Sequence, residues 1–92
     1  MEENQLQELY ELRDTIITTA KLLGYTVDIY KHTVEISKTP AKIGSSIAIF
    51  KIYEYSETNR TMLKSRFKHE GRKTFVTHKE KVDELNRILQ AL

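Results

Sequence analysis

The segment RTMLKSRFKHEGRK, residues 60–73, concentrates positive charge in a pattern that suits the binding of anions. Because side chains of a β-strand alternate between its two faces, four basic residues of this segment are predicted on one face. They are Arg60, Lys64, Arg66 and Lys68. Lysine and arginine bind the phosphates of nucleic acids without regard to base sequence. A second interpretation stays open, since charged side chains on an edge strand also prevent pairing with other chains.

A second basic group lies at the start of the predicted C-terminal helix. His78, Lys79 and Lys81 fall near its first turn, where the helix dipole disfavours positive charge unless an anion is nearby. We therefore expect one continuous surface for a DNA or RNA phosphate backbone, formed by the basic strand, the turn after it and this helix start. Its residues are Arg60, Lys64, Arg66, Lys68, Arg72, Lys73, His78, Lys79 and Lys81. Tyr53 and Tyr55 in the preceding strand are candidates for base stacking or for an interface.

Charge is divided unevenly along the chain. Residues 1–30 carry six carboxylates and two basic side chains, a net charge of −4, whereas residues 58–81 carry eight Lys or Arg and two Glu, a net charge of +6. Such polarity bears on partners rather than on fold. Four acidic residues of the predicted first helix form either a solvated face or a surface that docks a basic protein or a second copy of the chain. They are Glu3, Glu8, Glu11 and Asp14.

Patterns typical of catalysis or metal binding are sparse. The chain has no cysteine, which excludes disulfides, thiolate metal sites and a cysteine nucleophile. The three histidines lack the spacing of a metal site, and no glycine-rich phosphate loop or nucleophile elbow occurs. No cofactor and no metal are expected, and a non-enzymatic role is favoured. A small nuclease stays as a minor alternative, based on the His69–Glu70 pair beside a neighbouring arginine.

These side chains are positioned by a predicted helix, sheet and helix. Apolar residues recur at three- and four-residue spacing over residues 5–23 and again after Thr77, which begins a capping box with Glu80. Between the helices, alternation with period two predicts an antiparallel sheet of three or four strands, with residues 45–56 as its central strand. We expect one compact α+β domain over residues 1–92, in αβββα order, with both helices packed on one sheet face.

The sequence predicts where the connections between strands lie, but it specifies the geometry of some more closely than that of others. Val27 and Ile29 alternate out of phase with Val34 and Ile36, so residues 31–33 contain either a bulge or a tight turn. Residues 56–59 are predicted as a hairpin connection. A second turn at residues 70–71 is predicted to lead to a short strand over residues 73–76.

The composition leaves two main functional hypotheses. With 92 residues the chain holds one core, and its limited burial leaves a homo-oligomer open. The polar start and the lack of an apolar run of about 20 residues predict a cytoplasmic protein without membrane contact. The leading hypothesis is a small nucleic-acid-binding module. The alternative is a protein-interaction module, such as a phage- or plasmid-encoded regulator or inhibitor of a larger host enzyme, including a nucleic-acid-processing one.

Overall fold

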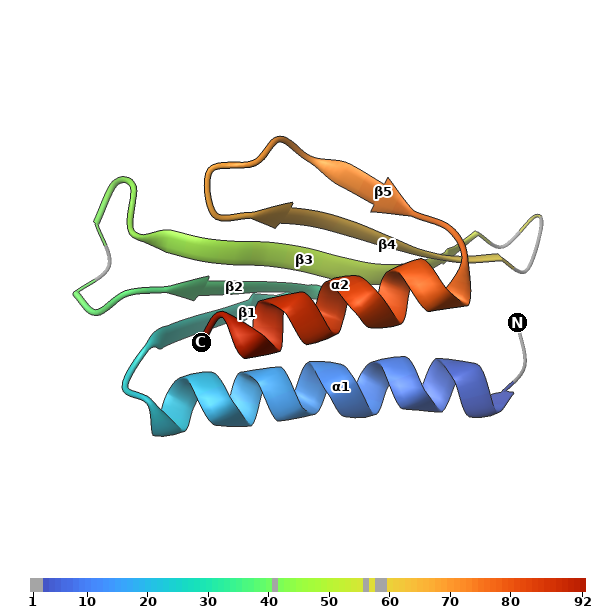
Figure 1. Ribbon diagram of the computed structural model, residues 1–92, viewed down its shortest axis with the longest axis horizontal. Coiled ribbons are helices and arrows are strands. Elements are labelled where there is room, and N and C mark those ends of the chain that lie inside the picture. The colour runs from blue at the N-terminus through green and yellow to red at the C-terminus, as the bar shows by residue number, and fades with distance from the viewer. Residues whose placement is uncertain (1–2, 41, 56, 58–59) are drawn as a thin grey trace.

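Two helices and a five-stranded sheet make up the computed structural model of the protein (Figure 1). The structure describes residues 3–40, 42–55, 57 and 60–92. The elements are α1 (Glu3–Leu22), β1 (Thr26–Tyr30), β2 (Thr33–Ser37), β3 (Ser46–Tyr55), β4 (Arg60–Phe67), β5 (Lys73–Phe75) and α2 (His78–Gln90). The α+β class is confirmed, whereas the expected three or four strands are five. Apart from Glu57, the predicted hairpin connection at residues 56–59 lies outside the described residues.

The sheet is an antiparallel meander in which every strand pairs with its neighbour in sequence, and β3 lies at its centre as predicted. The strand count differs because β1 and β2 are separate strands, joined by a two-residue turn at Lys31 and His32. Lys31 adopts the left-handed conformation, with φ of 57°. The turn places Ile29 opposite Val34, so the apolar residues of β1 and β2 share one face of the sheet.

Both helices lie side by side on that face of the sheet (Figure 1). Leu9 and Ile16 of α1 and Leu85 and Ile88 of α2 are fully buried, at spacings that place each pair on one side of its helix. The apolar stripes read from the sequence therefore form the helical half of the core. In the described part of the chain, no helix combines the length and the apolar character that crossing a membrane requires.

Residues at the helix ends explain where α2 begins and where α1 ends. Thr77 caps α2 as predicted, because its hydroxyl accepts a hydrogen bond from the backbone N–H of Glu80 at 3.2 Å and donates one to the Glu80 carboxylate at 2.9 Å. At the other helix, α1 ends at Leu22 and Gly24 takes a φ of 84°, a conformation that glycine adopts without strain. The chain then turns into β1.

The two faces of β3 have different environments. Phe50 and Ile52 are buried beneath the helices, with 1% and 4% of their surface exposed. The intervening residues Ile49, Lys51 and Tyr53 are only half-buried and lie on the other side of the sheet. We call this side, which neither helix covers, the open face.

Candidate functional site

A row of hydroxyl and ammonium groups crosses the open face from one edge of the sheet to the other. The strand register places Tyr30 opposite Thr33, and Thr33 opposite Lys51. It then places Lys51 opposite Lys64, and Lys64 opposite Thr74. Each of the five strands thus contributes one side chain that can donate a hydrogen bond to an anion. We call these five residues the donor row.

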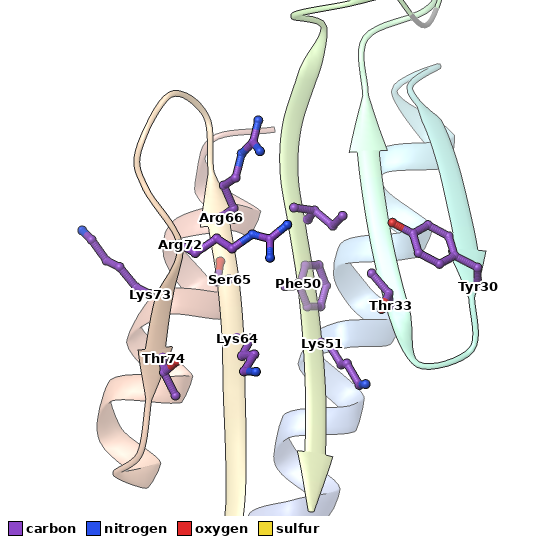
Figure 2. Close-up of a pocket in the computed structure, with 11 residues that line it drawn as sticks. Tyr30, Thr33, Phe50, Lys51, Lys64, Ser65, Arg66, Arg72, Lys73 and Thr74 are labelled. Carbon is purple, nitrogen blue, oxygen red and sulfur yellow. The ribbon is translucent and has the colours of Figure 1, made fainter.

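A cleft of about 480 Å³ opens over the donor row, and two arginines add to its positive charge. Arg66 lies on β4, and Arg72 reaches over the sheet from the loop before β5 (Figure 2). Ile49 supplies apolar surface to the lining. Among the described residues that line the cleft there is no Asp or Glu, so its lining is neutral or cationic throughout.

Four cationic side chains of the cleft lack an anionic partner. They are Lys51, Lys64, Arg66 and Arg72. Within the part of the chain that the structure describes, none of them forms an ion pair with a carboxylate. Lys51 and Lys64 also face each other directly across β3 and β4, an arrangement that like-charge repulsion destabilises. An anion bound between them would relieve this repulsion.

The predicted tyrosines lie next to the donor row on β3. The ammonium groups of Lys51 and Lys64 are 5.7 and 5.2 Å from the ring centroid of Tyr53, and the Tyr55 ring meets the Tyr53 ring edge-on at 5.5 Å. Burial, and then the neighbouring Tyr55, raises the pKa of Tyr53. Tyr55 has 49% of its surface exposed and lies opposite Arg60 of β4.

An acidic pair borders the cleft on the β1–β2 side. Asp28 and Glu35 face each other across the first two strands, and Glu35 also faces Ile49 of β3. Both carboxylates belong to the open face, because they alternate with residues that point toward the helices. Charge on this face is therefore negative over part of β1 and β2 and positive over β3, β4 and the loop before β5.

Lys68 does not share the open face with Arg66, as the alternation had suggested. The strand β4 ends at Phe67, and Lys68 adopts a left-handed φ of 53° while its backbone N–H donates to the carbonyl of Ile47. Its ammonium lies 5.2 Å from the ring centroid of Phe67. The alternation on which the expectation relied ends where the extended backbone ends.

Lys73 belongs to a network on the helix side of the sheet. It faces the buried Ser65 across β4 and β5, and although it contributes to the lining of the cleft, the end of its side chain points away from the cleft (Figure 2). Its Nζ lies 3.0 Å from Glu70 Oε1, and Arg87 Nη1 lies 2.7 Å from Glu70 Oε2. Hydrogen bonds from Lys73 and then from Arg87 lower the pKa of Glu70. Glu70 thus stays ionised and binds both cations.

Lys81 is buried where a phosphate contact had been expected. Only 1% of its surface is exposed, and its Nζ donates to the carbonyl of Thr61 at 2.9 Å. Burial lowers the pKa of Lys81. The first turn of α2 packs on the side of the sheet opposite the cleft, so the basic strand and the basic helix start do not form the continuous surface that the charge pattern predicts.

The other basic residues at the start of α2 have carboxylate partners. His78 Nε2 lies 2.9 Å from Glu8 Oε1 of α1, which links the two helices. Lys79 Nζ lies 2.7 Å from Asp83 Oδ2, and this hydrogen bond raises the pKa of Lys79. His78 and Lys79 are therefore each bound to a carboxylate of the protein itself.

The acidic residues predicted as a docking surface are all exposed on α1. They are Glu3, Glu8, Glu11 and Asp14. Glu11 accepts a hydrogen bond from Gln7 at 3.1 Å, and Asp14 forms an ion pair with Arg13 at 3.0 Å. Glu8 is bound to His78, so three of these four acidic residues have a partner within the helical layer.

Sequence reasoning missed four members of the donor row, namely Tyr30, Thr33, Lys51 and Thr74. For Lys51 a signal existed, because it is the only charged residue between Ser46 and Tyr53 in an otherwise largely apolar strand. The other three are common residue types in strands, and only the pairing of β1, β2 and β5 brings them to the cleft.

The chain matches no protein-family model, no curated protein and no solved structure at a significant level. Within the described residues, no group of three or more His, Asp or Glu side chains could hold a metal ion. The function must therefore be inferred from the chemistry of the open face.

Proposed function

We propose that the protein is a non-enzymatic module that binds the phosphate backbone of DNA or RNA on the open face of its sheet. The observation that carries this proposal is the convergence of four cations on one cleft from β3, β4 and the loop before β5, without carboxylate partners among the described residues. Phosphate oxygens are the ligands that such a group of lysines and arginines binds best.

The length of the basic surface favours a polyanion over a small anion. Arg60, Lys64 and Arg66 all point from β4 to the open face. Arg60 and Arg66 are six positions apart, which corresponds to about 20 Å along an extended strand. A single phosphate cannot reach both ends of this line, whereas a nucleic-acid chain can.

The first test compares two double variants that lose the same charge. Lys64→Gln with Arg66→Gln removes two cations from the cleft, whereas Lys21→Gln with Lys42→Gln removes two exposed lysines from the end of α1 and the β2–β3 loop. Binding is measured by the anisotropy of labelled single- and double-stranded oligonucleotides at several salt concentrations. The cleft variant should bind more weakly, and its slope of log affinity against log salt should fall by about 0.7 per lost contact for single strands. The control should retain nearly wild-type affinity.

Two results would reject the proposal. A folded cleft variant that binds as tightly as the wild type, with the same salt slope, would show that the open face is not the binding surface. Absence of binding by the wild type to every DNA and RNA ligand at low salt would reject nucleic acid as the partner. The protein-interaction alternative would then come first, with the exposed carboxylates of α1 as the surface to mutate.

A further inference from the structure

We infer that the ligand is single-stranded and runs along β3 and β4, with a base stacked on Tyr55 and phosphates bound by Arg60 opposite that tyrosine and by Lys51 and Lys64 farther along the strands. This inference rests on the proposed function and specifies its ligand class. It follows from the order in which cationic and aromatic side chains occur along the two central strands.

Cations lie next to an aromatic patch on the open face, with Lys51 and Lys64 before Tyr53 and Arg60 directly opposite Tyr55. Along the paired strands, Lys51–Lys64 is followed by Tyr53–Met62 and then by Tyr55–Arg60. Each nucleotide of a nucleic-acid strand likewise carries one charged phosphate in the backbone and one aromatic base attached to its sugar, so both kinds of group recur along the strand. Proteins that bind single strands combine a basic groove with aromatic rings on which bases stack.

Tyr55 has the more accessible ring of the two tyrosines. The Tyr53 ring is half-buried and is approached by Lys51, by Lys64 and by the edge of Tyr55. Tyr55 itself is 49% exposed, although tyrosine rings bury well in sheets. Bases of a duplex are already stacked on each other, so only an unpaired base can use this ring. The tyrosines thus favour a single strand over a duplex.

The acidic border favours one direction for the bound strand. A strand laid across the sheet would bring its phosphates toward Asp28 and Glu35 on β1 and β2. A strand laid along β3 and β4 stays over Lys51 and Lys64 and passes Glu35 only at Ile49, where Arg66 lies on the other side. Coulomb repulsion therefore selects the path parallel to the central strands.

The experiment that tests this inference uses three labelled ligands of equal length, each prepared as DNA and as RNA. The first is a single-stranded oligopyrimidine, the second an abasic strand with the same phosphates, and the third a duplex. Wild-type protein, Tyr55→Leu and Tyr55→Phe are titrated with each. The exposed position of Tyr55 makes loss of folding unexpected, and circular dichroism checks it.

The single strand should bind more tightly than the abasic strand and the duplex. Tyr55→Leu should weaken binding of the single strand by roughly 5- to 150-fold, the range expected for one base stacked on one ring. Its salt slope and its affinity for the abasic strand should stay unchanged, because the tyrosine carries no charge. Tyr55→Phe should bind like the wild type, since it keeps the ring.

The outcomes separate the inference from the proposed function. If the single strand, the abasic strand and the duplex bind equally and Tyr55→Leu binds like the wild type, the single-strand inference is overturned and phosphate binding stands. The single-strand inference is also overturned if Tyr55→Leu weakens binding of the abasic strand as much as binding of the intact strand, because the tyrosine then does not act through a base. If none of the three ligands binds the wild type, both are overturned.

Discussion

Lys51 illustrates how a single side chain can mark a site. It interrupts the apolar central strand, and its two neighbours Phe50 and Ile52 are both in the core. Its own side chain points to the open face, where it meets Lys64 across the strands and Tyr53 along its own strand. Like charges at directly paired positions destabilise the free protein slightly, and the anion that we propose to bind there would relieve this repulsion.

Glu35→Gln should raise both stability and nucleic-acid affinity. The substitution removes the repulsion between Glu35 and Asp28, and we expect the free energy of unfolding to rise by about 0.2–1 kcal/mol. It also removes a negative charge beside the cleft, so affinity for a single-stranded oligonucleotide should increase most at low salt. Urea denaturation and anisotropy measure the two effects.

The matched control for affinity is Glu11→Gln, which removes an exposed carboxylate from α1. It should change affinity less than Glu35→Gln does, because α1 lies on the far side of the sheet from the open face. A decrease of affinity in Glu35→Gln would contradict the view that the β1–β2 carboxylates border the path of the phosphates.

Among the elements, α2 is attached to the sheet by the ammonium group of Lys81, a residue that the sequence patterns predicted to be exposed. Lys81 crosses from the first turn of α2 to the carbonyl of Thr61 on β4. Farther along the helix, Arg87 binds Glu84 and Glu70 and lies 4.5 Å from the ring centroid of Phe67. These contacts hold the helix on β4 and so keep basic side chains of α2 away from the cleft.

Lys81→Met should stabilise the protein at neutral pH, by an amount that shrinks as the pH rises. Burial lowers the pKa of Lys81 below its ordinary value of 10.5, so the unfolded chain binds more protons between the two values. Wild-type stability therefore increases with pH across this interval, and this contribution is lost as the pH falls through the lowered pKa. Methionine fills a similar volume without the charge and removes this dependence.

Thermal melts of Lys81→Met and the wild type between about pH 7 and pH 10 test this prediction. Lys21→Met, at an exposed position, controls for the loss of one positive charge. If the wild type is the more stable protein by the same margin at every pH, the hydrogen bond to Thr61 outweighs the cost of burying the ammonium.

For the molecule as a whole, the two faces of the sheet differ in composition and burial. The helix-covered face carries the hydrophobic core, which includes Phe50, Leu63 and Leu85. The open face carries the donor row and the tyrosines, whose removal leaves that core intact. Stability and binding should therefore respond to different substitutions, even at adjacent positions in the chain.

Phe50→Ala and Lys51→Gln compare such adjacent positions. Phe50→Ala should lower the free energy of unfolding by about 3–5 kcal/mol, a large part of the about 5–15 kcal/mol typical of a whole domain. Lys51→Gln should stay within about 0.5 kcal/mol of the wild type, yet weaken binding to a single-stranded oligonucleotide. Urea denaturation and anisotropy separate the two, and a loss of stability in Lys51→Gln comparable to that in Phe50→Ala would contradict the division.

Local patterns sufficed for several features of this fold. The three- and four-residue spacing of apolar residues located both helices, the Thr77–Glu80 pair located the start of α2, and alternation with period two located β3 as the central strand. Each depends on residues within a few positions of one another, so composition and period are enough. The cluster of cations on β4 was visible for the same reason.

Contacts between distant residues were required for the rest. The pairing of Lys51 with Lys64 depends on the register of β3 and β4, and the burial of Lys81 depends on how α2 packs against β4. Strand register and the choice of a sheet face minimise the exposed apolar surface of the whole chain, and no short segment contains that information. Tertiary packing therefore divided the basic residues, placing Lys64 and Arg66 on the open face and Lys73 and Lys81 on the helix side.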